Sequence, residues 1–209
     1  MVDLDYSLYL VTDRGLLEGR DLIQEVKKAV NGGVSLVQLR EKEAGSRDFY
    51  ELALALKKEL AARRVPLIIN DRLDIALAIE ADGLHIGQED LPLSAVRKIT
   101  GPDFIVGISV GNLEQARRAE KEGASYLGAG PVFLTVTKAD AGEATGPEFI
   151  QVLKQECALP VIAIGGINED NLAGIKSAGA DGAAVVSALM GQNDIEAAAR
   201  RLRNLWEKT

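Results

Sequence analysis

Three polar side chains alternate along the segment QLREK, which begins at Gln38. Alternate side chains of an extended chain point to the same side, so Gln38, Arg40 and Lys42 are expected to share one face. One amide and two cations on one face favour an anionic ligand such as a diphosphate, held by charge-assisted hydrogen bonds. The alternative is a structural ion network with Glu41 or Glu43.

Two carboxylates follow the next two apolar runs. Asp71 comes directly after the run that ends at Asn70, and Asp90 lies three residues beyond Gly87. Mg²⁺ is typically held by one or two carboxylates together with phosphate oxygens and water, so this pair predicts a Mg²⁺ site beside the cations. The alternative is helix capping, with Asp71 before a short helix and Asp90 before Leu91.

A second anion site is expected near the C-terminus. Gly165 and Gly166 end the seventh apolar run, and Ser187 ends the eighth after Val186. Glycines allow backbone N–H groups to approach an anion closely, and the N-terminus of a following helix adds a favourable dipole. These residues therefore predict a phosphate site that needs no basic surface.

The segment of residues 130–146 is long for a connection in a compact domain, as binding loops and lids often are. It carries two hydroxyls and one cation, from Thr135, Thr137 and Lys138, which we expect to close over a phosphate. Ser109, at the end of the fifth apolar run, adds a further hydroxyl.

The elements that position these residues alternate along the whole chain. Apolar runs of four to six residues lack polar alternation, as strands covered on both faces do; they span residues 8–12, 36–39, 67–70, 84–87, 105–109, 126–130, 161–165 and 183–187. Between them lie helical patterns, one apolar face being formed by Phe49, Leu52, Ala53, Leu56 and Leu60, another by Ile195, Ala198, Ala199, Leu202 and Trp206.

Eight such units predict the α/β class and a single (βα)₈ TIM barrel, formed as one domain by residues 1–209. A doubly wound sheet also alternates strands and helices, but units of about 26 residues suit closure better. Glycine-containing turns precede strands two, four, six and eight, where we expect glycine to end the helix in the left-handed conformation. In a TIM barrel the active site lies at the C-terminal ends of the strands, where the polar residues above are found.

Composition limits the function classes. Thirty-one acidic against 24 basic residues give a net charge of −7, which argues against a nucleic-acid or anionic-membrane surface. The single cysteine, Cys157, excludes an internal disulfide and fits a reducing cytoplasm. The acidic first residues differ from a signal peptide, and no apolar run is long enough to span a membrane.

His85, the one histidine, is expected to be packed and hydrogen-bonded rather than catalytic. The oligomeric state, a homo-oligomer included, is left open.

Five short motifs in this order resemble thiamine phosphate synthase. They are QLREK from Gln38, NDR from Asn70, HIGQED from His85, GPVFLTVTK from Gly130 and AIGGI from Ala163. The resemblance extends from about residue 9 to residue 187, nearly the whole chain.

The resemblance implies a transferase of thiamine biosynthesis that joins two phosphorylated small molecules. It would condense 4-amino-2-methyl-5-(diphosphooxymethyl)pyrimidine with 4-methyl-5-(2-phosphoethyl)thiazole, giving thiamine phosphate and diphosphate. By analogy with the family, the pyrimidine diphosphate would be bound by Gln38, Arg40, Lys42, Asn70, Ser109 and Lys138. The thiazole phosphate would be bound by Thr135, Val136, Thr137, Gly166, Val186 and Ser187. Arg40, Lys42 and Lys138 would stabilise charge in catalysis, and Asp71 and Asp90 would hold the Mg²⁺ cofactor.

The sequence departs from the family at three positions. The family usually has proline where Leu134 and Val136 stand, and many relatives have histidine where Gly111 stands.

Two other functions remain as alternatives. Thiazole tautomerases share the barrel but place a catalytic histidine at the position of Gly111. A catalytically silent protein that binds thiamine precursors and regulates a partner should have lost the metal carboxylates.

Overall fold

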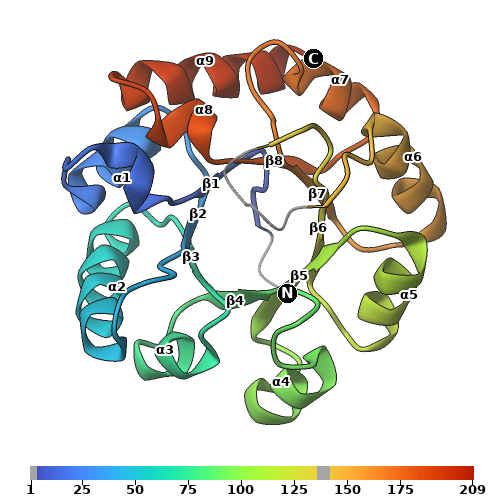
Figure 1. The fold of residues 1–209 in the computed structure, drawn as a ribbon, viewed down its shortest axis with the longest axis horizontal. Coiled ribbons are helices and arrows are strands. Elements are labelled where there is room, and N and C mark those ends of the chain that lie inside the picture. Colours follow the sequence, from blue (N-terminus) through green and yellow to red (C-terminus); the bar gives the residue numbers. More distant parts are fainter. Residues whose placement is uncertain (1–3, 136–141) are drawn as a thin grey trace.

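The predicted barrel is present. The computed structural model describes residues 4–135 and 142–209. Eight parallel strands close in chain order, each paired with the next and β8 with β1 (Figure 1). The strands are β1 (Leu8–Val11), β2 (Leu36–Leu39), β3 (Leu67–Asn70), β4 (Gly83–Ile86), β5 (Ile105–Val110), β6 (Tyr126–Ala129), β7 (Val161–Ile164) and β8 (Gly182–Val185).

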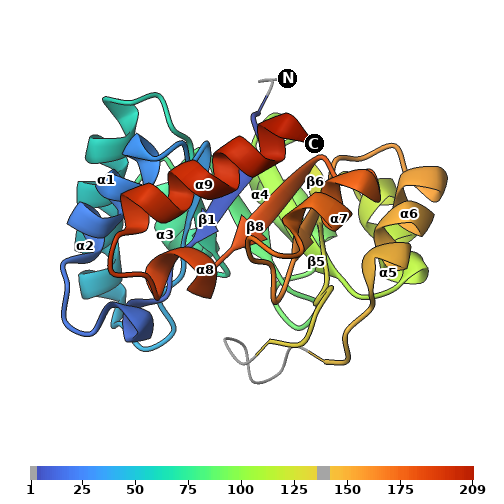
Figure 2. The same cartoon turned by 90° about the horizontal axis from the view of Figure 1, so that it is seen from above.

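Helices surround the barrel on all sides (Figure 1). They are the 3₁₀ helix η1 (Arg14–Leu17), α1 (Leu22–Asn31), α2 (Ser46–Ala61), α3 (Leu73–Ala78), α4 (Leu93–Thr100), α5 (Leu113–Lys121), α6 (Pro147–Glu156), α7 (Leu172–Ser177), α8 (Ser187–Met190) and α9 (Ile195–Lys208). Helix α9 crosses beside β1 and β8 and packs against α1 and α7 (Figure 2). No helix of the described residues is long and apolar enough to cross a membrane.

The strand and helix predictions agree with the structure apart from small shifts at the ends. Each strand ends within two residues of its predicted end, and Ser187 begins α8 rather than ending β8. The apolar face predicted for α9 is buried along its whole length, and that of α2 is buried except for Leu52, which is partly buried.

Strand alternation divides the apolar residues into two cores. One lies between the barrel and the helices, and includes Leu8, Leu10 and Val37. The other fills the barrel interior, with Tyr9 of β1, Leu36 of β2 and Tyr126 of β6 among its members. Apolar side chains of this second core fill the interior, and a cavity lined by polar as well as apolar residues lies at the C-terminal ends of the strands.

Glycine on β5 makes room for the large side chain of Tyr126. Gly107 is aligned with Tyr126 in the register, and a Cβ at this position would lie 2.0 Å from Tyr126 Cζ. Two fully buried groups cannot overlap in this way, so Tyr126 can lie across the barrel only if residue 107 has no side chain.

We therefore predict that Gly107→Ala destabilises the protein by about 1–3 kcal/mol or more, through overpacking. The matched control is Gly174→Ala in α7, where an added Cβ meets nothing within 4 Å. That substitution should be neutral or stabilise the helix by roughly 0.5–1 kcal/mol. Urea unfolding of both variants measures the difference. Equal stability of the two variants would contradict the close contact at Gly107.

Candidate active site

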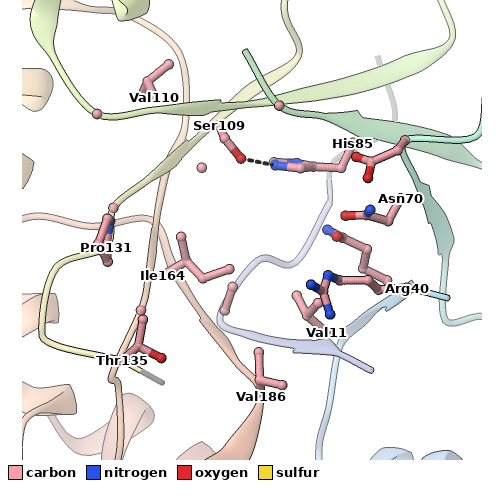
Figure 3. Close-up of a pocket in the computed structure, with 18 of the residues that line it drawn as sticks. Val11, Arg40, Asn70, His85, Ser109, Val110, Pro131, Thr135, Ile164 and Val186 are labelled. Atoms are coloured by element: carbon pink, nitrogen blue, oxygen red, sulfur yellow. Dashed lines mark hydrogen bonds between the residues drawn. The ribbon is translucent and has the colours of Figure 1, made fainter. Parts of the chain in front are cut away.

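One cavity of about 630 Å³ lies at the C-terminal ends of the strands. Figure 3 shows Arg40, Asn70 and His85 on one side of it and Pro131 and Thr135 on the other. All predicted site residues that the structure describes line this cavity, namely Gln38, Arg40, Lys42, Asn70, Asp71, Asp90, Ser109, Thr135, Gly166, Val186 and Ser187. The other three, Val136, Thr137 and Lys138, lie outside the described residues.

The alternation predicted for the segment that begins at Gln38 brings three polar side chains to the cavity, one from the end of β2 and two from the residues that follow it. Gln38 is buried, Arg40 is partly buried and Lys42 is exposed, so the solvent exposure of the three side chains increases from the barrel interior to the rim. The backbone N–H of Arg40 donates to Thr12 Oγ1 at 3.0 Å, which ties the end of β2 to β1.

Within the described residues, Arg40 and Lys42 form no ion pair with Glu41 or Glu43, the partners considered for an alternative ion network. Glu41 pairs with Arg14 at 3.2 Å, away from the arginine next to it in sequence. Arg40 Nη1 instead lies 3.7 Å from Asp13 Oδ2, a long contact to a partly exposed carboxylate. Such a contact orients the guanidinium while leaving most of its N–H groups for a ligand.

Neither carboxylate acts as the N-cap of a following helix. The N-cap positions of α3 and α4 are Arg72 and Pro92, and neither makes a side-chain capping bond. Asp90 Oδ2 accepts a hydrogen bond from the Gly87 N–H at 2.6 Å, which folds the segment after β4 back on itself. Asp71 has a positive φ of 59°, a strained conformation for a residue with a side chain.

The two carboxyl groups, Asp71 and Asp90, lie close enough to share a hydrogen bond. Burial, followed by the hydrogen bond and the negative charge of Asp90, raises the pKa of Asp71 to about 6. Asn70 and Arg40 act in the opposite direction. Two carboxylates forced together in this way are a natural site for a cation, because a cation relieves their mutual repulsion.

These donors fit Mg²⁺ only as part of a mixed site. Among the described residues there is no group of three or more His, Cys, Asp or Glu side chains that could enclose a metal ion. Two carboxylate oxygens are what Mg²⁺ usually takes from a protein when substrate phosphates and water complete its octahedron. Asp71 and Asp90 therefore suit a cation that arrives with a phosphorylated substrate.

The opposite side of the cavity is lined with backbone. Gly165 and Gly166 both have positive φ values, of 99° and 65°. A Cβ at Gly166 would lie 2.6 Å from the carbonyl oxygen of Leu134, and one at Gly165 would lie 2.6 Å from Pro131. The loop after β6 thus rests directly on the glycine pair, and its Phe133 N–H donates to the Gly165 carbonyl at 3.1 Å.

A family model named thiamine monophosphate synthase matches residues 8–189. The chain belongs to this family. The thiamine monophosphate synthase match covers all eight strands, and so includes every residue that lines the cavity. The resemblance inferred from the five motifs is confirmed.

Relatives of the thiamine monophosphate synthase family resemble the chain over its full length. A thiamine-phosphate synthase of Syntrophomonas wolfei is 64% identical and covers 100% of both chains. One from Desulfitobacterium hafniense is 53% identical over 97% of this chain and 98% of its own. The solved thiamine phosphate pyrophosphorylase from Pyrococcus furiosus has 40% identity and a TM-score of 0.90, covering 98% of this chain and 96% of its own.

The predicted enzyme activity is confirmed with the family. The chain is a transferase of thiamine biosynthesis, like the thiamine-phosphate synthases to which it is similar over its full length. The tautomerase and regulatory alternatives are not favoured.

Several residues that line the cavity were not predicted as site residues. His85 is packed and hydrogen-bonded as expected, yet it also lines the cavity. Gln88 and Gln115 lie at the rim, where Gln88 Nε2 donates to the Ser109 carbonyl at 2.6 Å. His85 is paired with the predicted site residue Asn70 in the strand register, and this pairing between two strands is not contained in any local sequence pattern.

Proposed function

We propose that the cavity binds the two substrates of the transferase on opposite sides. The pyrimidine diphosphate would lie against the ends of β2 to β5, with Gln38, Arg40, Lys42, Asn70 and Ser109 as its partners, joined by Lys138. The thiazole phosphate would lie against Thr135, Val136, Thr137, Gly166, Val186 and Ser187. The observation that carries this assignment is that cations and carboxylates line one side of a single cavity and a glycine pair lines the other.

The reaction breaks the bond between the pyrimidine methylene carbon and the diphosphate oxygen, and the electron pair leaves with diphosphate. Arg40 and Lys42, with Lys138, would neutralise the negative charge that grows on this leaving group. The electron-rich aminopyrimidine stabilises the positive charge left on the methylene carbon. The thiazole nitrogen then donates its lone pair to that carbon, and the positive charge remains in the product as a thiazolium.

No protein nucleophile is needed for this chemistry. The chain has to hold two reactants in contact and stabilise a leaving group, which are positioning and electrostatic tasks. The buried Gln38 and the packed glycine pair give rigid walls for this purpose. Asp71 and Asp90 would hold Mg²⁺, which when bound supplies further positive charge to the diphosphate.

The test is to supply both substrates with Mg²⁺ and to measure thiamine phosphate and diphosphate. The expected result is that both products form in equal amounts and that a chelator abolishes turnover. Failure to make thiamine phosphate under these conditions would refute the proposed function. A substitution at Gly166 should affect chiefly the KM for the thiazole phosphate, because only that substrate is assigned to the glycine pair.

The tautomerase alternative requires an imidazole where Gly111 stands. The one histidine of the chain, His85, is on β4 and hydrogen-bonds to Tyr126 and Ser109. Conversion of a thiazole carboxylate phosphate to its tautomer would support this alternative, and we expect none.

We further propose that the protein acts in the cytoplasm on small phosphorylated molecules and does not bind nucleic acid or membranes. The net charge of −7 and the lone, buried Cys157 support this assignment.

A further inference from the structure

A continuous chain of hydrogen bonds crosses the barrel interior beneath the cavity. Gln38 Nε2 donates to Tyr9 Oη at 2.8 Å, and the hydroxyls of Tyr9 and Tyr126 lie 2.9 Å apart. Tyr126 Oη is 3.0 Å from His85 Nδ1, and His85 Nε2 is 3.0 Å from Ser109 Oγ (Figure 3). These hydrogen bonds thus join two residues from separate strands, β2 and β5, that we assign to the pyrimidine diphosphate.

The two tyrosines cannot touch a ligand. Tyr9 is 1% exposed and Tyr126 is fully buried, and neither lines the cavity, whereas Gln38, His85 and Ser109 do. Both tyrosines belong to the core that fills the barrel interior. Any influence they have on the reaction must therefore pass through the groups they hold.

The barrel backbone holds this chain of residues in place. Tyr126 lies over Gly107, and a Cβ at Gly128 would lie 2.9 Å from His85 Cε1. The rings of Tyr9 and Tyr126 meet edge to face, with centroids 6.1 Å apart. These close contacts restrict the movement of the tyrosine and histidine rings and so favour the hydrogen bonds described above.

Counting hydrogens fixes the direction of every bond. Burial raises the pKa of both tyrosines, so each hydroxyl keeps its single hydrogen. The Gln38 nitrogen donates to Tyr9 and cannot accept, so the Tyr9 hydrogen goes to Tyr126. Tyr126 then donates its own hydrogen to His85 Nδ1.

The same count continues to the far end of the chain. Because His85 Nδ1 accepts, the imidazole hydrogen is on Nε2 and is donated to Ser109 Oγ. Ser109 accepts at its oxygen and keeps its own hydrogen for another partner. Any other order with this Gln38 orientation, including a doubly protonated His85, leaves one of the two buried tyrosine hydrogens without an acceptor among these groups, which is unfavourable for a buried donor.

We propose that Tyr9, Tyr126 and His85 are positioning residues that present the Gln38 carbonyl oxygen as an acceptor and the Ser109 hydroxyl as a donor to the ligand. This inference rests on the proposed function for the identity of the ligand. An aminopyrimidine suits this pair of groups, because its exocyclic amine donates and its ring nitrogens accept. A ring with an oxygen in place of the amine would meet the Gln38 oxygen with another acceptor and be rejected.

Rotating the Gln38 amide would reverse the whole chain. Tyr9 would then donate to the amide oxygen, His85 would carry its hydrogen on Nδ1, and the Ser109 hydrogen would be used up on Nε2. The two arrangements differ in which imidazole nitrogen is protonated. The direction of the hydrogen bonds can therefore be determined from which ring nitrogen of His85 is protonated.

The sequence makes this measurement simple, because His85 is the only histidine in 209 residues. Labelling histidine with ¹⁵N gives one pair of ring-nitrogen NMR signals in the intact, substrate-free protein. We expect Nδ1 to show the shift of an unprotonated nitrogen and Nε2 that of a protonated one. The reversed pattern, or a doubly protonated ring at neutral pH, would overturn the proposal.

Tyrosine-to-phenylalanine variants then test whether the chain acts as a unit. Tyr126→Phe removes the donor to Nδ1, so the nitrogen signals should shift toward a mixture of tautomers. Tyr9→Phe should leave the His85 signals nearly unchanged, because Tyr126 can still donate, but it frees the Gln38 amide to rotate. Tyr50→Phe, on the outer face of α2 and 36% exposed, is the matched control and should change nothing.

Kinetics supply the second readout. Tyr9→Phe and Tyr126→Phe should each lower kcat/KM for the pyrimidine diphosphate roughly three- to tenfold, while the KM for the thiazole phosphate is unchanged. Unchanged nitrogen signals in Tyr126→Phe, or equal losses for both substrates, would contradict the positioning role. If the unmodified protein makes no thiamine phosphate, the assigned ligand is wrong. The nitrogen signals of His85 would still show in which direction the hydrogen bonds run from Gln38 to Ser109.

Discussion

Asp71→Asn is expected to lower kcat/KM at saturating Mg²⁺ by roughly 10²- to 10³-fold. The substitution keeps the shape of the side chain and removes one of the two negative charges that would attract the cation. Asp90 alone then has to hold Mg²⁺ beside the diphosphate, and it is already engaged by the Gly87 N–H at 2.6 Å. Steady-state kinetics at increasing Mg²⁺ measure the loss, which should appear both in kcat and in the Mg²⁺ concentration required.

The raised pKa of Asp71 predicts the pH dependence of this effect. Because the pKa is about 6, Asp71 is largely ionised at about pH 7.5 and largely protonated at about pH 5. A proton and Mg²⁺ compete for the same carboxylate, so Mg²⁺ should bind more weakly as the pH falls below about 6. The Asp71→Asn variant should lose most of this dependence.

The same pKa separates loss of function from loss of folding. A carboxyl whose pKa is raised by folding favours the folded state below its ordinary pKa of 3.8, and this contribution is lost as the pH rises through about 6. At about pH 7.5 without Mg²⁺, Asp71→Asn should therefore be as stable as the unmodified protein or more so. Urea unfolding checks this directly.

Asp74→Asn provides the matched control for Asp71→Asn. Asp74 is close in sequence, but its side chain is 62% exposed and pairs with Arg72. Removing an exposed pair of this kind costs about 0–1 kcal/mol and should leave activity and its Mg²⁺ dependence unchanged. If Asp71→Asn were as active as Asp74→Asn, the carboxylate pair could not be the Mg²⁺ site.

The barrel could be predicted from sequence because its strands are buried on both faces. Short runs such as Leu67–Asn70 contain almost nothing but aliphatic residues, and no other element needs that pattern at this length. The cavity followed from the strand ends, since the chain places its polar residues where each apolar run stops. The side chains of Gln38, Arg40 and Lys42 share the cavity, as predicted from their alternation along the segment that ends β2 and continues beyond it, which is a local pattern.

Features that depend on several strands at once were not predictable. The hydrogen-bond chain through Tyr9 and Tyr126 requires the register of β1 against β2, of β4 against β5 and of β5 against β6, which no local pattern contains. The turn into β4 also differs from expectation. The positive φ there belongs to Glu80, at 53°, whereas Gly33 and Gly179 have the positive φ expected before β2 and β8.

Lys42→Ala is the second substitution with a large expected effect, a roughly 10²- to 10³-fold loss of kcat with the pyrimidine diphosphate. Lys42 is exposed and lies in the segment that follows β2, where its long side chain can stay in contact with a diphosphate as it departs. The charge it neutralises is larger on the leaving group than on the bound substrate. Its removal should therefore lower kcat more than it raises KM.

Two further variants test why Lys42 matters. Lys42→Arg tests whether a positive charge at this position is sufficient, and Lys98→Ala tests whether losing one cation from the protein surface has an effect by itself. Lys42→Arg keeps the cation and should recover much of the activity, although the planar guanidinium orients its donors differently. Lys98→Ala removes an exposed cation from α4, outside the cavity, and should leave the kinetics unchanged. Full activity of Lys42→Ala would show that Lys42 does not stabilise the leaving group. A fall in kcat that is accompanied by a fall in the free energy of unfolding would instead assign Lys42 a structural role. Because Lys42 is exposed at the rim, we expect its loss to affect the reaction while the free energy of unfolding stays the same.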